Sequence, residues 1–225
     1  MLKTKNRILL LIHYFVGYFF ILPYLLGFLC DLLNHSCDTL MELVIITLHL
    51  LITVYLTKDL LKNDFREQLS TRKLIIYFLA LYLMTQFVNI ACNLIIVLIN
   101  GDIITGANEV AVNNMIMNER YLAIFSACIF APISEELVFR AGFFKGLIKY
   151  PILAYFFGGA CFGLIHFTEV IFESFNFINL LHVLPYIFAG LFFCKIYKET
   201  DNIFYNILIH IIFNSISLWL TFILI

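Results

Sequence analysis

Long apolar runs dominate this chain of 225 residues and restrict it to a helical membrane fold. Its residues are 63% hydrophobic and 13% charged, whereas soluble domains are about 45–50% apolar and about 25% charged. A membrane-crossing helix needs about 20 apolar residues and satisfies its backbone polar groups internally. We therefore predict an all-α, polytopic transmembrane helix bundle with about seven spans, eight being the alternative count. The expected spans are residues 8–30, 40–57, 74–99, 120–145, 150–168, 177–195 and 203–225.

Basic residues indicate how these spans are oriented. Twelve of the 14 Lys and Arg residues lie in four clusters, before the first span and after the second, fourth and sixth spans. With seven spans, all four clusters fall on one side of the membrane. Because cytoplasmic loops are enriched in Lys and Arg, we expect a cytoplasmic N-terminus. The more polar segment 100–119 is expected to be a surface or re-entrant piece.

Three ionisable residues, Glu135, Glu136 and Arg140, stand near the middle of the fourth span. Insertion scales assign roughly 2.5–3.5 kcal/mol to each charged residue at the centre of a span, so such residues usually have a function. Glu136 and Arg140 are four residues apart and are expected to pair on one helix face. Glu135 is turned about 100° away and remains available to another partner.

The fifth and seventh spans contribute histidine and asparagine residues. If the turn before the fifth span lies near Tyr150, Glu135 and His166 should lie at the same depth, about 22 Å from that turn at 1.5 Å per residue. His210 and Asn214 are four residues apart in the seventh span and share one face. Because polar groups within a bilayer need partners, we expect these two residues to contact the carboxylates and His166.

The six polar residues suit the hydrolysis of a peptide bond. A buried glutamate can take a proton from water, and an imidazole can hold that water or a leaving amine. A second histidine and an asparagine amide can stabilise an oxyanion. Alternatively, Glu135, His166 and His210 are a sound ligand set for a divalent metal such as Zn²⁺, with one position open for water. His49 and His182 are interpreted as packed helix residues.

Three motifs of this chain resemble those of the CAAX protease and bacteriocin-processing family, also called the Abi family, which includes the CAAX prenyl endopeptidase. The motifs match in order, residue type and placement on helices, and they extend from about residue 132 to residue 214. They read Glu135-Glu136-x-x-x-Arg140, Phe162-x-x-x-His166 and His210-x-x-x-Asn214.

The resemblance implies a role for each of the six polar residues. Glu135 would activate the water with His166 beside it, while Glu136 and Arg140 would maintain the geometry. The two polar residues of the seventh span would form the oxyanion pocket. Members of the family are usually described as metalloproteases, but a metal-independent glutamate mechanism is the alternative, and the residues leave both open.

The resemblance predicts an intramembrane endopeptidase built as a single membrane domain, residues 1–225. Within it, residues 1–119 would form N-terminal helices without motifs and residues 120–225 a catalytic helical core. The expected partners are a peptide or membrane-protein substrate and the lipid bilayer. Nucleic acid is not expected as a partner, because the chain has no basic patch of the kind that binds it.

A composition rich in Ile, Phe, Leu and Asn and poor in Ala suggests an AT-rich bacterial gene. We therefore expect a multi-pass protein of the bacterial plasma membrane. For a bacterial chain, the family resemblance implies a role in bacteriocin or peptide maturation or in self-immunity. The alternative is a non-catalytic immunity protein that binds or sequesters a bacteriocin or its receptor. A proton- or metal-coupled transporter is a weaker alternative, because no inverted repeat is found.

Overall fold

The computed structural model describes residues 2–33, 39–167 and 177–224, which form helices and no strands. Some turns have the wider, π-helical form and are labelled η. They continue the neighbouring α-helices, so that η1, η2, η3 and η4 lie within longer helices. The elements are α1 (Thr4–Ile12), η1 (His13–Ile21), α2 (Leu22–Leu32), α3 (Thr39–Phe65), α4 (Thr71–Asn100), α5 (Ala107–Asn118), α6 (Arg120–Phe125), η2 (Ser126–Phe130), α7 (Ala131–Glu135), η3 (Glu136–Phe144), α8 (Pro151–Tyr155), η4 (Phe156–Ala160), α9 (Cys161–Ile165), α11 (Phe177–Thr200) and α12 (Ile203–Leu224).

Among the described residues, six helices are long and apolar enough to cross a membrane, which confirms the all-α polytopic prediction. They coincide with six of the seven predicted spans. The predicted fifth span forms a shorter apolar helix, Pro151–Ile165. At 1.5 Å per residue this helix is about 22 Å long, less than the ~30 Å of a bilayer core. It ends directly before His166, which therefore stands at a helix end and not within a helix.

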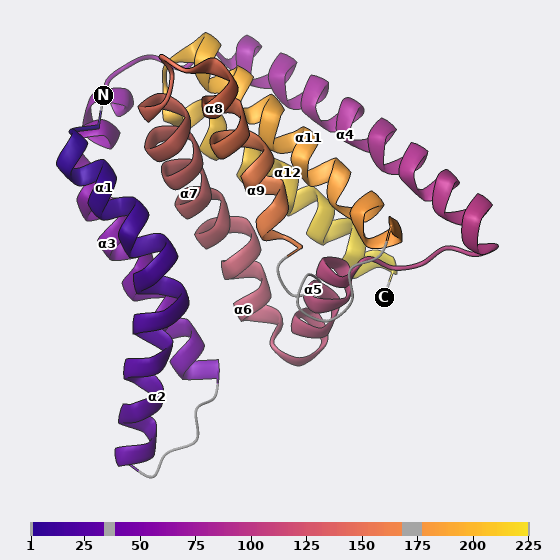
Figure 1. Cartoon of the computed structure of the whole chain (residues 1–225), viewed down its shortest axis with the longest axis horizontal. Helices are drawn as coiled ribbons and strands as arrows, with labels where there is room; N and C mark the ends of the chain where they lie inside the picture. Colours follow the sequence, from indigo (N-terminus) through magenta and orange to yellow (C-terminus); the bar gives the residue numbers. More distant parts are fainter. Residues whose placement is uncertain (1, 34–38, 168–176, 225) are drawn as a thin grey trace.

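The arrangement of the helices places the motif-bearing segments in the middle of the bundle. In Figure 1, α1, α2 and α3 lie on one side of the C-terminal helices and α4 lies on the other. α11 packs against α4, α9 and η4, while α12 packs against η2, η3 and α7. The predicted surface segment 100–119 contains α5, which packs against α6.

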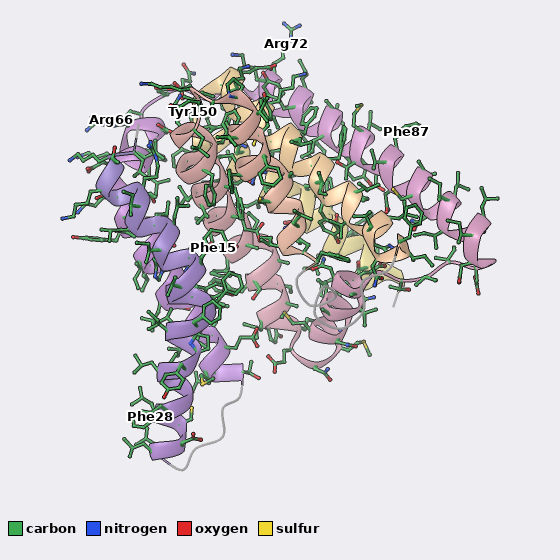
Figure 2. All side chains as sticks on the ribbon, in the orientation of Figure 1. Phe15, Phe28, Arg66, Arg72, Phe87 and Tyr150 are labelled. Atoms are coloured by element: carbon green, nitrogen blue, oxygen red, sulfur yellow. The ribbon has the colours of Figure 1, made fainter. Side chains whose placement is uncertain are left out.

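The two ends of the bundle differ in charge. Figure 2 shows Arg66 and Arg72 at one end of the molecule, with Phe28 at the opposite end. The connection between α3 and α4, the N-terminus of α1 and the turn before α8 meet at the first end in Figure 1. The basic clusters predicted to share one side of the membrane therefore lie at one end of the bundle, which we call the basic end.

Outward-facing side chains are apolar, as a lipid environment requires. Phe87 and Leu98 of α4, for example, are 72% and 85% exposed. In the interior, glycines bring α11 into backbone contact with η4 and α9. A Cβ atom on Gly163 would lie 2.3 Å from the backbone N of Ile187, and one on Gly190 would lie 2.3 Å from the carbonyl O of Gly159. Small residues allow this close approach between membrane helices.

We expect Gly163→Ala to lower the free energy of unfolding by about 1–3 kcal/mol, because the added methyl group would push α9 away from α11. Thermal unfolding of the purified protein in detergent measures this loss. Gly27→Ala is the matched control, since a Cβ atom at Gly27 meets nothing within 4 Å. Equal Tm values for the two variants would contradict the close contact.

Candidate active site

A buried ion pair lies at the centre of the candidate site. Oε2 of Glu136 lies 3.1 Å from Nε of Arg140, and both side chains are fully buried. The four-residue spacing puts them on one face of η3, so the predicted pairing is confirmed. Because an unpaired charge in an apolar interior is very costly, each residue makes the burial of the other possible. Both residues belong to the wider π-helical turns of η3, and such turns often occur at functional sites.

The Glu136 carboxylate also binds α12. Its Oε1 accepts a hydrogen bond from Nδ1 of His210 at 2.9 Å, and its Oε2 accepts one from the side-chain amide of Asn206 at 3.1 Å. Asn206 is absent from the sequence-based prediction. Its position four residues before His210, on the same helix face, is the signal that could have identified it. One carboxylate thus connects η3 with two consecutive turns of α12.

The imidazole of His210 lies between the two carboxylates. Its Nδ1 hydrogen is donated to Glu136, so its Nε2 faces Glu135, 3.9 Å from Oε2. This separation is too long for a hydrogen bond. The side chains of His210 and Glu135 are only 6% and 13% exposed, so the gap is almost closed to the surroundings. A water molecule that bridges the two groups would satisfy both.

Arg140 is held in place by α9 and α11. Its Nη2 donates a hydrogen bond to the carbonyl O of Gly190 at 3.2 Å. Its guanidinium carbon lies 4.3 Å from the ring centroid of Phe162 and 4.9 Å from that of Phe193. Both rings also contact the ring of His210. The two phenylalanines therefore shield the ion pair and the imidazole together and add cation–π attraction.

His166 follows the last residue of α9 and turns toward α11. Its Nδ1 lies 3.1 Å from the carbonyl O of Phe162, and its ring stacks on Tyr186 with centroids 4.6 Å apart. The backbone contact between Gly163 and Ile187 brings these two rings together, because each ring is within three residues of that contact. His166 is thus positioned by the packing of α9 against α11.

Glu135 and His166 lie on the two helices that flank the turn near Tyr150, and their equal depth in the membrane stays a prediction. η3 ends at Phe144, nine residues after Glu135, whereas α8 begins at Pro151, fifteen residues before His166. In the described structure these two side chains do not hydrogen-bond to each other.

Asn214 has a different partner from the predicted ones. Its side-chain amide donates a hydrogen bond to the carbonyl O of Ala127 in η2 at 2.9 Å. Polar side chains in a membrane helix bind backbone carbonyls when these are nearer than other polar side chains. An amide has a second N–H, which this bond leaves available. Asn214 therefore connects α12 with η2 on the same helix face that carries His210.

The N-terminal helices also reach the site. His49 of α3 is fully buried, which confirms its interpretation as a packed residue. Its Nε2 lies 2.7 Å from the hydroxyl of Ser134, the residue before Glu135, and its ring stacks on His13 with centroids 4.7 Å apart. The part of the chain without motifs thereby supports the turn that carries the catalytic candidate Glu135.

Three of the site residues have the donor chemistry of a zinc site. The Nδ1 atoms of His166 and His210 each face an oxygen acceptor, as is usual for metal-binding histidines. However, the described residues contain no group of three His, Cys, Asp or Glu side chains close enough to hold one metal ion. The geometry of the described residues therefore does not fit a metal ion bound jointly by Glu135, His166 and His210.

One family model matches the chain, that of the type II CAAX prenyl endopeptidase Rce1-like proteins, over residues 117–216. This segment contains all six polar residues predicted from the motifs. The match confirms the resemblance, since residues 117–216 are similar to this family of endopeptidases. The chain thus combines a segment similar to a protease family with six described helices that are long and apolar enough to cross a membrane. No curated protein and no solved structure matches it.

Arg140→Met should lower the free energy of unfolding by about 3–5 kcal/mol, because it leaves the Glu136 carboxylate buried without its cation. Lys195→Met is the matched control. It removes a pair of the same spacing, Lys195 and Glu199 at 4.0 Å, whose side chains are roughly half exposed. Such pairs contribute about 0–1 kcal/mol. Chemical denaturation of both variants in detergent checks the difference, and similar losses would contradict the central place of the buried pair.

Proposed function

We propose that this protein is an intramembrane endopeptidase in which Glu135 activates a water molecule for attack on a peptide carbonyl. The observation that supports this most is the 3.9 Å gap between Oε2 of Glu135 and Nε2 of His210. A base and an imidazole face each other there without a direct hydrogen bond, beside a fully buried ion pair. Such an arrangement suits a water molecule that loses a proton as it attacks.

The proposed reaction proceeds in two steps. In the first, the water oxygen bonds to the carbonyl carbon while its proton passes to the Glu135 carboxylate, and the carbonyl oxygen becomes an oxyanion. In the second, the C–N bond breaks and Glu135 returns the proton to the leaving amine. The products are a carboxylic acid and an amine, so no other reactant is needed.

The remaining residues would orient and stabilise these groups. Glu136 fixes the ring of His210 through Nδ1, so that Nε2 stays directed into the gap, where the imidazolium form of the ring can donate to the oxyanion. The second N–H of Asn214 is available for the same purpose. His166, whose ring stacks on Tyr186, would orient the substrate or the water. Arg140 acts as a positioning residue, because it holds Glu136.

We expect Glu135→Gln to reduce peptide cleavage by about 10²-fold or more, because the amide cannot accept the proton of the water. Its Tm should stay close to that of the wild type, since within the described residues the nearest charged partner of the Glu135 carboxylate, Nε2 of His210, lies 3.9 Å away. The measurement is cleavage of a mixed fluorogenic peptide library by purified protein in detergent. Glu67→Gln, an exposed position, serves as the control. Full activity of Glu135→Gln would exclude this mechanism.

Treatment with a metal chelator tests the zinc alternative. Because the three possible ligands do not converge, we expect cleavage to persist in EDTA and in 1,10-phenanthroline. The rate before and after dialysis against each chelator is the measurement. Loss of activity, followed by recovery on addition of Zn²⁺, would instead show that substrate binding brings Glu135, His166 and His210 together around a metal.

We further propose a location in the bacterial plasma membrane with the N-terminus in the cytoplasm. The grouping of Arg66, Arg72 and the other basic residues at one end supports this orientation. The proposed role is the maturation of a small peptide or membrane-associated precursor, as in bacteriocin processing or self-immunity. A binding protein that only sequesters a toxin is the competing role. If the protein only binds the toxin, the Glu135→Gln variant would still protect the cells that produce it. If protection requires proteolysis, this variant would not protect them.

A further inference from the structure

A polar pocket lies beside His166, away from the basic end. It has a volume of about 60 Å³ and is formed by the second half of α4, the start of α5 and the first half of α11. This volume is enough for several water molecules. A larger groove of about 390 Å³ at the basic end is lined by α1 and α3 and contains none of the six site residues. Polar side chains in the pocket include Asn89, Asn108, Glu109, His166, His182 and Tyr186.

Direct contacts connect this pocket with the candidate active site. The side-chain amide of Asn108 donates a hydrogen bond to the hydroxyl of Tyr186 at 2.9 Å. The ring of Tyr186 stacks on His166, which itself lines the pocket. A group bound in the pocket therefore lies against one of the residues to which the reaction is assigned.

A polar stripe on α4 includes one residue of the pocket wall, Asn89. Thr85, Asn89 and Asn93 recur every four residues on one face of a helix that is otherwise strongly apolar. Nδ2 of Asn93 lies 3.5 Å from Oδ1 of Asn89, and the buried hydroxyl of Thr85 has no hydrogen-bond partner in the described part of the chain. Polar residues within membrane helices usually face a partner or a water-filled cavity. The proposed chemistry does not use these three residues, so they require another explanation.

We propose that this pocket admits water to the active site from the non-cytoplasmic side, and that its exposed residues Asn89 and Glu109 contact an extended peptide substrate. The amides of Asn89 and Asn108 would bind the peptide backbone, and the exposed carboxylate of Glu109 would favour a Lys or Arg side chain near the cleaved bond. The substrate class is thus an exported or outward-facing peptide segment with a basic residue. This inference rests on the proposed protease function and on the expected orientation of the basic end.

The first experiment measures kcat and KM for library peptides with and without a basic residue. We expect Asn89→Leu to raise KM by about tenfold and leave kcat within about twofold, because it removes binding and not chemistry. Asn63→Leu, the same change in the groove at the basic end, should leave both constants unchanged. Glu109→Gln, at an exposed position, should raise KM for the basic peptides alone. If Asn89→Leu and Glu109→Gln both behave like Asn63→Leu, the pocket does not bind substrate.

The second experiment tests the side of access with the same hydrophilic peptides, which do not cross membranes. Cells that produce the protein yield right-side-out and inside-out vesicles, with the Glu135→Gln protein as background. We expect cleavage in right-side-out vesicles only. Cleavage in inside-out vesicles only would overturn the proposed access while leaving the protease function intact. If the wild-type protein in detergent cleaves none of these peptides, the proposed function fails, and the inference fails with it.

Discussion

The arrangement of the candidate site depends on the Glu136 carboxylate. It lies in a part of the bundle without solvent exposure, where it binds Arg140 along its own helix and His210 and Asn206 on α12. A buried carboxylate with this many partners determines how η3 and α12 are positioned along and around their axes. If either helix shifted, the Glu136 carboxylate would lose partners and remain as an unpaired buried charge. Glu136 therefore also determines the position of the His210 ring relative to Glu135.

Aromatic and glycine contacts hold the short helix Pro151–Ile165 in a fixed position beside the ion pair. Phe162 and Phe193 enclose the guanidinium of Arg140 and contact His210, while Gly163 allows α9 to touch the backbone of α11. The consequence is a rigid apolar wall around a few polar atoms. In such surroundings electrostatic interactions are stronger than in water, and unpaired polar groups are more costly. This explains how so small a set of polar residues can be both stable in the membrane and available for chemistry.

The sequence predicted well the features that depend on local spacing. Glu136 and Arg140 pair because four residues bring side chains to one helix face, and the spans follow from the length of the apolar runs. Features that depend on the contact between distant segments were harder to predict. The partner of Asn214, for example, is a backbone carbonyl of η2 that no motif reveals. His49 looked like an ordinary packed residue because its contact with Ser134 lies 85 positions away along the chain.

The short fifth helix has a consequence for the protonation pattern of His166. A helix that ends within a membrane leaves its last carbonyl oxygens without the usual donors. The backbone N–H of His166 donates to Gly163 at 3.2 Å, so the carbonyl of Phe162 is left to the imidazole, with Nδ1 at 3.1 Å. Because a carbonyl can only accept, the hydrogen of the neutral ring must be on Nδ1. The end of the helix thereby selects one tautomer of the imidazole and keeps Nε2 as a free base directed away from its own backbone.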